Sequence, residues 1–132
     1  VPRFVEVMMG GSVMFPDEQG SAVDAYIPRE LLGAQHSQDL AVSFKSATRN
    51  GATGFTFKMG MTSNHGVDVF IVGCRDHVNG PITSVAVLSA ATVSDIGPGT
   101  YYSWGPKKPF RGVEHITTRQ QLLATLLPLR DV

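Results

Sequence analysis

The feature that most constrains the fold is an alternation of apolar and polar side chains over residues 39–62, centred on Asn50-Gly51. Asn-Gly is a strong signal for a two-residue hairpin turn, because both residues readily adopt a positive φ. Such a turn pairs Arg49 with Ala52 and keeps the alternation in step on both strands. The segment therefore predicts a long antiparallel β-hairpin with one apolar and one polar face.

The two predicted faces differ in chemistry. Large apolar side chains form the first, namely Leu40, Val42, Phe44, Phe55, Phe57, Met59 and Met61. Small, polar and basic residues form the second, namely Ala41, Ser43, Lys45, Ala47, Arg49, Gly54, Thr56, Lys58 and Gly60. Lys45 then lies opposite Thr56, and Ser43 opposite Lys58. Lysines beside hydroxyls suit phosphate and sugar contacts, although composition alone favours an ordinary solvated sheet face.

The rest of the chain predicts further strands and one helix. Strands are expected at residues 4–9, 12–15, 22–27, 67–73 and 82–94. Gly10-Gly11 is expected to form the turn between the first two strands, and a second turn is expected at 16–20. Residues 29–32 are expected to form a helical turn or a loop. The Gly- and Pro-rich stretch 95–112 is expected to be loop. Thr117 and Gln120 resemble a capping box that opens a helix over 118–127. Because tight turns link the strands, we expect an α+β domain with about six antiparallel strands, an N-terminal hairpin and a C-terminal helix.

Composition limits the classes of function. The 132 residues are enough for one domain, residues 1–132, and the 42% apolar content can form a core. Basic and acidic residues number 11 each, so any nucleic-acid binding must come from a local patch. The single cysteine excludes an intrachain disulfide, and no apolar run is long enough to cross a membrane. The first eleven residues, with acidic Glu6 and no long apolar run, are not expected to be a signal peptide.

The length of the hairpin predicts a partner subunit. Arms of eleven residues extend roughly 36 Å, whereas a ten-residue helix is about 15 Å long. One such helix cannot cover the apolar face, and an uncovered remainder would be a large exposed apolar patch. We therefore expect a second copy of the chain to supply cover, most simply as a symmetric dimer.

The hairpin strands Leu40-Ala-Val-Ser-Phe-Lys45 and Phe55-Thr-Phe-Lys-Met59 resemble a strand pair in the coat proteins of single-stranded RNA bacteriophages (levivirus-like). Chain length and the order of elements are also similar. The resemblance implies a coat-protein dimer that assembles into an icosahedral shell, in a virion formed in the host cytoplasm. It places Ser43, Lys45, Thr56 and Lys58 on the RNA-binding face, which Arg49 extends. The family's second C-terminal helix and its base-stacking tyrosine have no counterpart here, so recognition of a specific RNA hairpin is not expected.

Other chemistry is weaker in the sequence. His36-Ser37 could suggest a small esterase-like hydrolase, but neighbours in an extended chain point to opposite faces and there is no nucleophile elbow. Cys74-Arg75-Asp76-His77 lacks the spacing of a zinc site, and a buried thiol is the expected account of Cys74. Lys107, Lys108 and Arg111 lie among aromatic residues and could stack bases, or order a loop or subunit contact. We expect no enzyme, metal, cofactor, small-molecule substrate or membrane partner. The alternative to a coat protein is a small β-barrel binding or protruding module of a larger protein.

Overall fold

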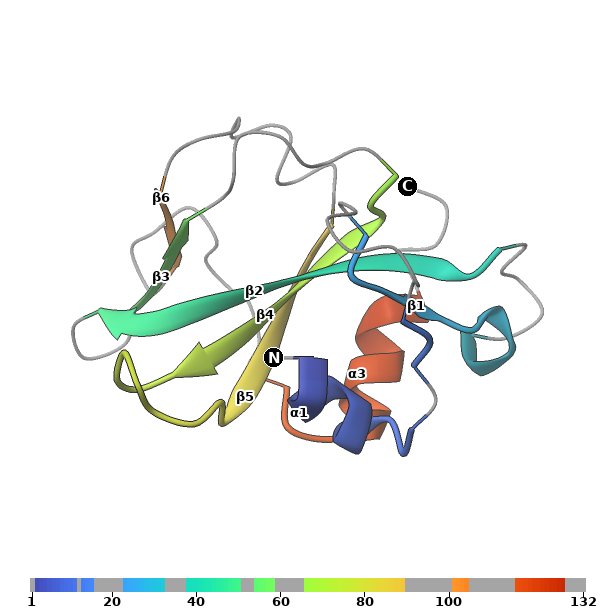
Figure 1. Cartoon of the computed structure of the whole chain (residues 1–132), viewed down its shortest axis with the longest axis horizontal. Coiled ribbons are helices and arrows are strands. Elements are labelled where there is room, and N and C mark those ends of the chain that lie inside the picture. The colour runs from blue at the N-terminus through green and yellow to red at the C-terminus, as the bar shows by residue number, and fades with distance from the viewer. Residues whose placement is uncertain are drawn as a thin grey trace.

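The computed structural model describes residues 2–11, 13–15, 23–32, 38–50, 54–58, 66–89, 101–104 and 116–127. The elements in chain order are α1 (Pro2–Met8), β1 (Ala25–Ile27), the 3-10 helix η1 (Arg29–Leu32), β2 (Leu40–Asn50), β3 (Gly54–Lys58), β4 (Val69–Arg75), β5 (Ser84–Ser89), β6 (Tyr101–Trp104) and α3 (Arg119–Leu126). The predicted α+β class and the C-terminal helix are confirmed, and of the two alternatives for residues 29–32 the helical turn is the one observed (Figure 1).

The sheet is mixed, which corrects the prediction of an antiparallel one. Its strands follow the order β5-β4-β2-β3-β6, and β1 pairs with the first residues of β2. β2 and β4 are parallel along seven residue pairs, from Val42↔Val69 to Thr48↔Arg75, while the other pairings are antiparallel. The prediction failed because it assumed tight turns throughout. Residues 51–68, which include β3, instead form a connection long enough to bring β4 to the opposite edge of β2.

The central hairpin exists, but its register differs from the predicted one. Asn50 belongs to β2 and pairs with Gly54, and Arg49 pairs with Phe55 rather than with Ala52. Three residues, 51–53, therefore separate the paired ends of the two strands, in place of the predicted two-residue turn Asn50-Gly51. This changes the pairing by three positions. An odd change exchanges the faces of one strand relative to the other, because side chains alternate with a period of two.

The N-terminal hairpin predicted around Gly10-Gly11 is wrong in its first strand, which is helix α1. Gly10 and Gly11 have φ angles of 68° and 84°, and their amides donate to the carbonyls of Val7 and Glu6 at 3.1 and 2.9 Å. Left-handed glycines with such bonds end helices rather than joining strands. The second half of the prediction partly holds, since residue 14 forms an antiparallel bridge with Tyr26 of β1.

Both faces of the sheet carry buried apolar clusters. The helix-side cluster joins even-numbered residues of β2 and odd-numbered residues of β4 to the helices; its buried members are Val5, Met9, Val13, Ala25, Ile27, Leu32, Leu40, Val42, Val69, Ile71, Val85, Ile116, Leu122 and Leu126. The opposite cluster contains Val23, Ala41, Ala47, Phe55, Val67, Phe70, Val72, Cys74, Ala86 and Leu88. Phe55 thus lies with Ala41 and Ala47, away from Leu40 and Val42, as the observed register requires.

Helix α3 begins one residue later than predicted. Thr118 is its N-cap, and the side chains and amides of Thr118 and Gln121 form a reciprocal capping box. Ile116 forms a two-bond bridge with Val85 of β5, and this bridge fixes the start of the helix against the sheet. Tyr101–Trp104 forms β6, which corrects the prediction of loop for these four residues.

Two helices pack on the same face of the sheet, so one premise of the predicted dimer is wrong. Val5 and Met9 from α1 and its C-terminal turn lie in one cluster with Leu122 and Leu126 of α3. Figure 1 shows α1 and α3 together on one side of β2 and β5. Part of the cover that was expected from a second subunit therefore comes from the chain's own N-terminal segment.

Candidate nucleic-acid interface

The odd-numbered residues of β2 form the candidate interface, on the face opposite α1 and α3. Because side chains alternate along a strand, Ser43, Lys45 and Arg49 belong to one row. Their parallel neighbour β4 places Phe70 beside Ser43 and Val72 beside Lys45. The row therefore passes over an apolar surface, and its three polar side chains have different environments.

Ser43 is committed to the fold. Its side chain is 3% exposed, and its hydroxyl donates to Oδ2 of Asp24 at 3.2 Å. The same carboxylate oxygen accepts the amide of Phe44 at 2.7 Å. A buried hydroxyl that satisfies a structural carboxylate does not reach a phosphate, so the structure removes Ser43 from the exposed part of the predicted RNA face.

Lys45 is the residue of this row best placed to offer a charge. Its side chain is half-buried at the middle of β2. Within the described ranges, it has neither a hydrogen bond nor an ion pair. A lysine can lay its methylene groups along apolar neighbours while its ammonium group stays in water. An incoming phosphate would therefore meet a cation that is not already neutralised by a described acidic residue.

Arg49 is exposed but engaged. Its Nε lies 2.7 Å from Oδ1 of Asp76, and its guanidinium lies 5.2 Å from the ring centroid of its register partner Phe55. Sequence reasoning missed the Phe55 contact because it paired Arg49 with Ala52, and it missed the Asp76 contact because it did not foresee the parallel pairing of β2 with β4. Binding of a phosphate at Arg49 would compete with the Asp76 carboxylate, so this residue contributes less free positive charge than the predicted face assumed.

Thr56 and Lys58 do not share the register row of Ser43, Lys45 and Arg49. Thr56 pairs with Thr48, and Thr48 is also the register partner of Arg75. The Nε of Arg75 donates to Oγ1 of Thr48 at 3.0 Å. The predicted single face is thus divided in two by the change of register, and the arrangement of all five predicted RNA-binding residues on one surface is wrong.

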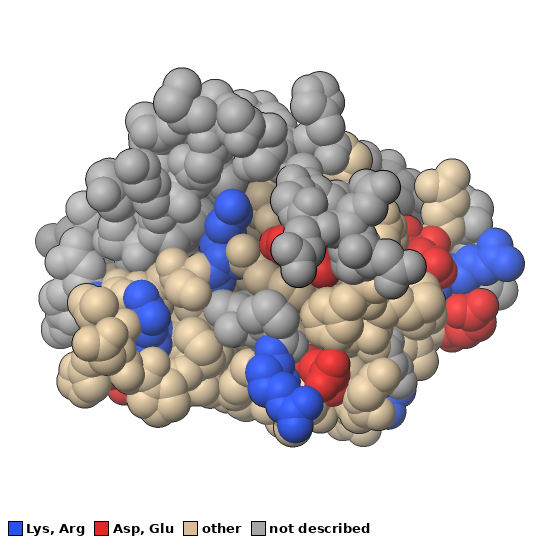
Figure 2. Space-filling view, in the orientation of Figure 1, with Lys and Arg blue, Asp and Glu red and all other residues tan. Residues whose placement is uncertain are grey.

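Charge is dispersed on the surface of the described residues. Figure 2 shows the face seen in Figure 1, with the lysine and arginine side chains in separate groups and acidic side chains beside several of them. Uncharged surface separates the groups. This pattern fits the zero net charge of the chain and limits any polyanion contact on this face to local sites.

Cys74 is buried, as predicted. The side chain is fully buried, and its Sγ lies 3.7 Å from the carbonyl oxygen of Val72. Burial raises the pKa of the Cys74 thiol from 9.0 to about 12, while a hydrogen bond with Ser84 acts in the opposite direction. Its sequence neighbours Asp76 and His77 are exposed. In the portion of the chain with described coordinates, no three His, Cys, Asp or Glu residues come together as metal ligands.

Native Cys74 is expected to resist thiol reagents. At pH 8 we expect labelling by a chromogenic disulfide to be at least about a hundredfold slower in the native protein than in urea, because both burial and the raised pKa suppress reactive thiolate. Absorbance of the released chromophore gives both rates. Stability should also fall as the pH rises above 9.0, since the unfolded thiol then loses its proton while the folded thiol keeps it up to about pH 12. Equal rates with and without urea would contradict a buried thiol.

Three sequence candidates lie outside the described residues. They are His36-Ser37, the cluster of Lys107, Lys108 and Arg111, and the predicted turn at 16–20. Among the residues that are described, no helix has the length and apolar character needed to cross a membrane.

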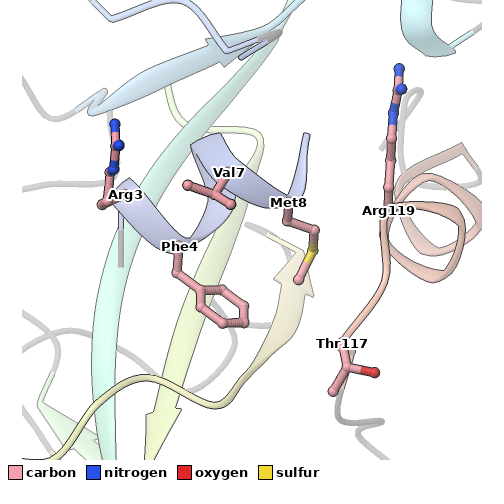
Figure 3. A pocket seen from close by; sticks show the side chains of 6 residues that line it. All are labelled: Arg3, Phe4, Val7, Met8, Thr117 and Arg119. Atoms are coloured by element: carbon pink, nitrogen blue, oxygen red, sulfur yellow. The ribbon is translucent and has the colours of Figure 1, made fainter. Parts of the chain in front are cut away.

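A groove between the two helices was not anticipated from the sequence. It has a volume of about 410 Å³ and is lined by Arg3, Phe4, Val7, Met8, Thr117 and Arg119. Figure 3 shows the side chains of α1 on one side of the gap and those at the start of α3 on the other. The groove was missed because residues 4–9 were expected to be a strand. The spacing of Val5 and Met9, four residues apart and both buried, was the available signal of a helix.

Comparison with known proteins gives no relative: no protein-family model and no curated protein matches the sequence.

Proposed function

We propose that the chain is a viral coat protein that self-associates into an icosahedral shell and contacts single-stranded RNA through the middle of β2. The proposal places it in a virion that assembles in the host cytoplasm. It requires no catalytic residue and no cofactor. The dimer remains part of the proposal, with α1 and α3 now included among the elements that cover the sheet.

One observation carries the RNA part of this proposal. Lys45 lies at the centre of β2, the longest of the described strands, on the face opposite the helices, and its side chain has no hydrogen bond or ion pair among the described residues. The other residues of its row between Ala41 and Ala47 are buried, so a nucleic-acid backbone on this face would meet the Lys45 ammonium group rather than those side chains. Lys45 is therefore the primary RNA contact in the proposal, and Arg49 contributes if phosphate displaces Asp76. Ser43 is a structural residue in the proposal. An RNA contact at Thr56 or Lys58, which belong to the other register row, has to be tested separately.

Expression of the chain alone tests the proposal. A coat protein is expected to elute as megadalton particles that carry host RNA, detected by size-exclusion chromatography, electron microscopy and ultraviolet absorbance. We expect Lys45→Glu to reduce the RNA per particle by about half or more, because a phosphate contact is replaced by repulsion. The control Arg29→Glu makes the same charge change at an exposed site on η1 and should leave packaging unchanged. Lys58→Glu, measured alone, tests whether the row that contains Thr56 and Lys58 also contacts RNA.

Equal loss of RNA in the Lys45 and Arg29 variants would mean that only total charge matters and would remove Lys45 from the interface. Wild-type protein that stays small and free of RNA would remove the coat function itself.

A binding module is the second candidate, and one observation favours it. Buried apolar clusters occur on both faces of the sheet within a single chain. A domain that buries both sheet faces by itself does not need a partner in order to be stable. A monomer that is stable at all protein concentrations tested, and free of RNA, is the result expected from this alternative.

A further inference from the structure

The groove between α1 and the start of α3 has an apolar wall that the fold covers only in part. α1 presents Val5 inward to the helix-side cluster, while Val7 is 65% exposed. Phe4 and Met8 line the groove beside Val7 and are only partly buried (Figure 3). α1 has seven residues and carries apolar side chains on two sides. Its contact with the sheet covers one of these sides, so part of the apolar surface on the other side stays exposed.

The charge at the groove favours a carboxylate. Arg119, in the first turn of α3, is exposed and has no ion pair or hydrogen bond within the described ranges. Arg3, across the groove, is paired with Glu6 at 2.7 Å, so a ligand carboxylate at Arg3 would compete with that carboxylate. The amino-terminal end of a helix also carries partial positive charge. A ligand that fits would therefore combine an apolar side chain with a carboxylate that reaches Arg119.

The same chain carries a segment with this chemistry. Met14 and Phe15 are 43% and 44% exposed, although both are large and apolar. Asp17 and Glu18 follow them in the sequence after a single proline. We propose that the groove binds residues 14–18 of a second copy of the chain, with Met14 or Phe15 against Val7 and an acidic side chain at Arg119.

This contact uses two different surfaces, one from each copy. Such a head-to-tail interface leaves a free groove at one end and a free segment at the other, so it can continue into rings or larger assemblies. As an assembly contact it rests on the proposed coat function and adds the surfaces through which the copies meet. The complementarity of the apolar residues and charges applies equally to an assembly that holds no RNA.

A mixing experiment tests the contact. Val7→Asp alters the groove and Phe15→Asp alters the segment; both residues are exposed, so both variants should fold, as circular dichroism will verify. We expect each variant alone to self-associate at least about tenfold more weakly than the wild type. An equimolar mixture should form a complex of two chains, because one intact groove and one intact segment remain. Sedimentation velocity measures all three samples.

A charge exchange provides a second, independent measurement. Arg119→Glu should weaken association, as should Asp17→Arg combined with Glu18→Arg, and a mixture of the two proteins should recover it. Two mixtures that stay monomeric, or single variants that assemble like the wild type, overturn the contact. RNA content separates this result from the coat function. A two-chain complex from a protein that never packages RNA keeps the contact and removes the coat function, whereas RNA-filled particles without complementation do the reverse.

Discussion

The Leu122→Ala variant is expected to unfold with a free energy about 3 kcal/mol lower than the wild type. Leu122 is fully buried on α3, in the cluster that joins this helix to Ile71 and Val85 of the sheet. Truncation to alanine removes buried methyl groups and leaves a cavity that the sheet cannot close, because its backbone is fixed by the β4–β5 pairing. This makes Leu122 a direct probe of how the sheet is covered.

Urea unfolding at two protein concentrations measures the effect. The loss should be the same at both, since the residues around Leu122 belong to its own chain. Leu127→Ala is the matched control, because Leu127 follows the same helix but is 42% exposed, and it should cost less than about 1 kcal/mol. A loss at Leu122 that grows on dilution would mean that a second copy contributes to this face.

The expected result bears on the dimer. Sequence reasoning assigned one helix to cover a sheet roughly 36 Å long and inferred a partner from the shortfall. The structure places α1 on the same face as α3, so the shortfall is smaller than it appeared. Self-association now needs its own surface, and the groove with the exposed Phe15 supplies a specific one.

The elements predicted best are those fixed by local chemistry. The apolar alternation located β2, and a Thr-Gln cap located α3 to within one residue. The register of the hairpin could not be predicted from Asn50-Gly51, because two- and three-residue loops use the same residue types. The parallel pairing of β2 with β4 depends on contacts far apart in the sequence, which no local pattern encodes. Residues 4–9 were read as a strand although their apolar spacing also fits a helix.

The candidate site was harder to predict than the fold. The alternation placed Ser43, Lys45 and Arg49 in one row of β2, as observed, while the RNA contact of Lys45 stays a prediction. What could not be read was the partner of each side chain. Asp24 and Asp76 are 19 and 27 positions away from the residues they bind, Ser43 and Arg49. Because of these carboxylates, a face that looked free of acid along one strand is partly neutralised in three dimensions.

The Asp24→Ala variant is also expected to lose about 3 kcal/mol of stability. One carboxylate oxygen of Asp24 accepts both the Phe44 amide at 2.7 Å and the Ser43 hydroxyl at 3.2 Å. The amide of Asp24 donates to the carbonyl of Val42 at 2.8 Å, so this residue, just before β1, links the start of β1 to the first half of β2. Removal of the carboxylate leaves two donors without this acceptor, one of them on a buried serine. Asp24→Asn, whose amide oxygen can still accept, should lose less.

Asp68→Ala is the matched control for Asp24, because among the described residues the Asp68 carboxylate accepts one amide, that of Ala41 at 2.9 Å, and lies at an exposed position. The Asp68→Ala variant should lose about 1 kcal/mol of stability.

The Ser43→Ala variant should also lose about 1 kcal/mol of stability. In particles it should leave the RNA content unchanged, because the Ser43 hydroxyl donates to Asp24 rather than to a phosphate. Urea unfolding and the RNA content of purified particles measure the two effects. A stable Ser43→Ala variant that packages less RNA would return Ser43 to the interface, and a loss at Asp24 no larger than at Asp68 would show that the shared carboxylate is not a structural link.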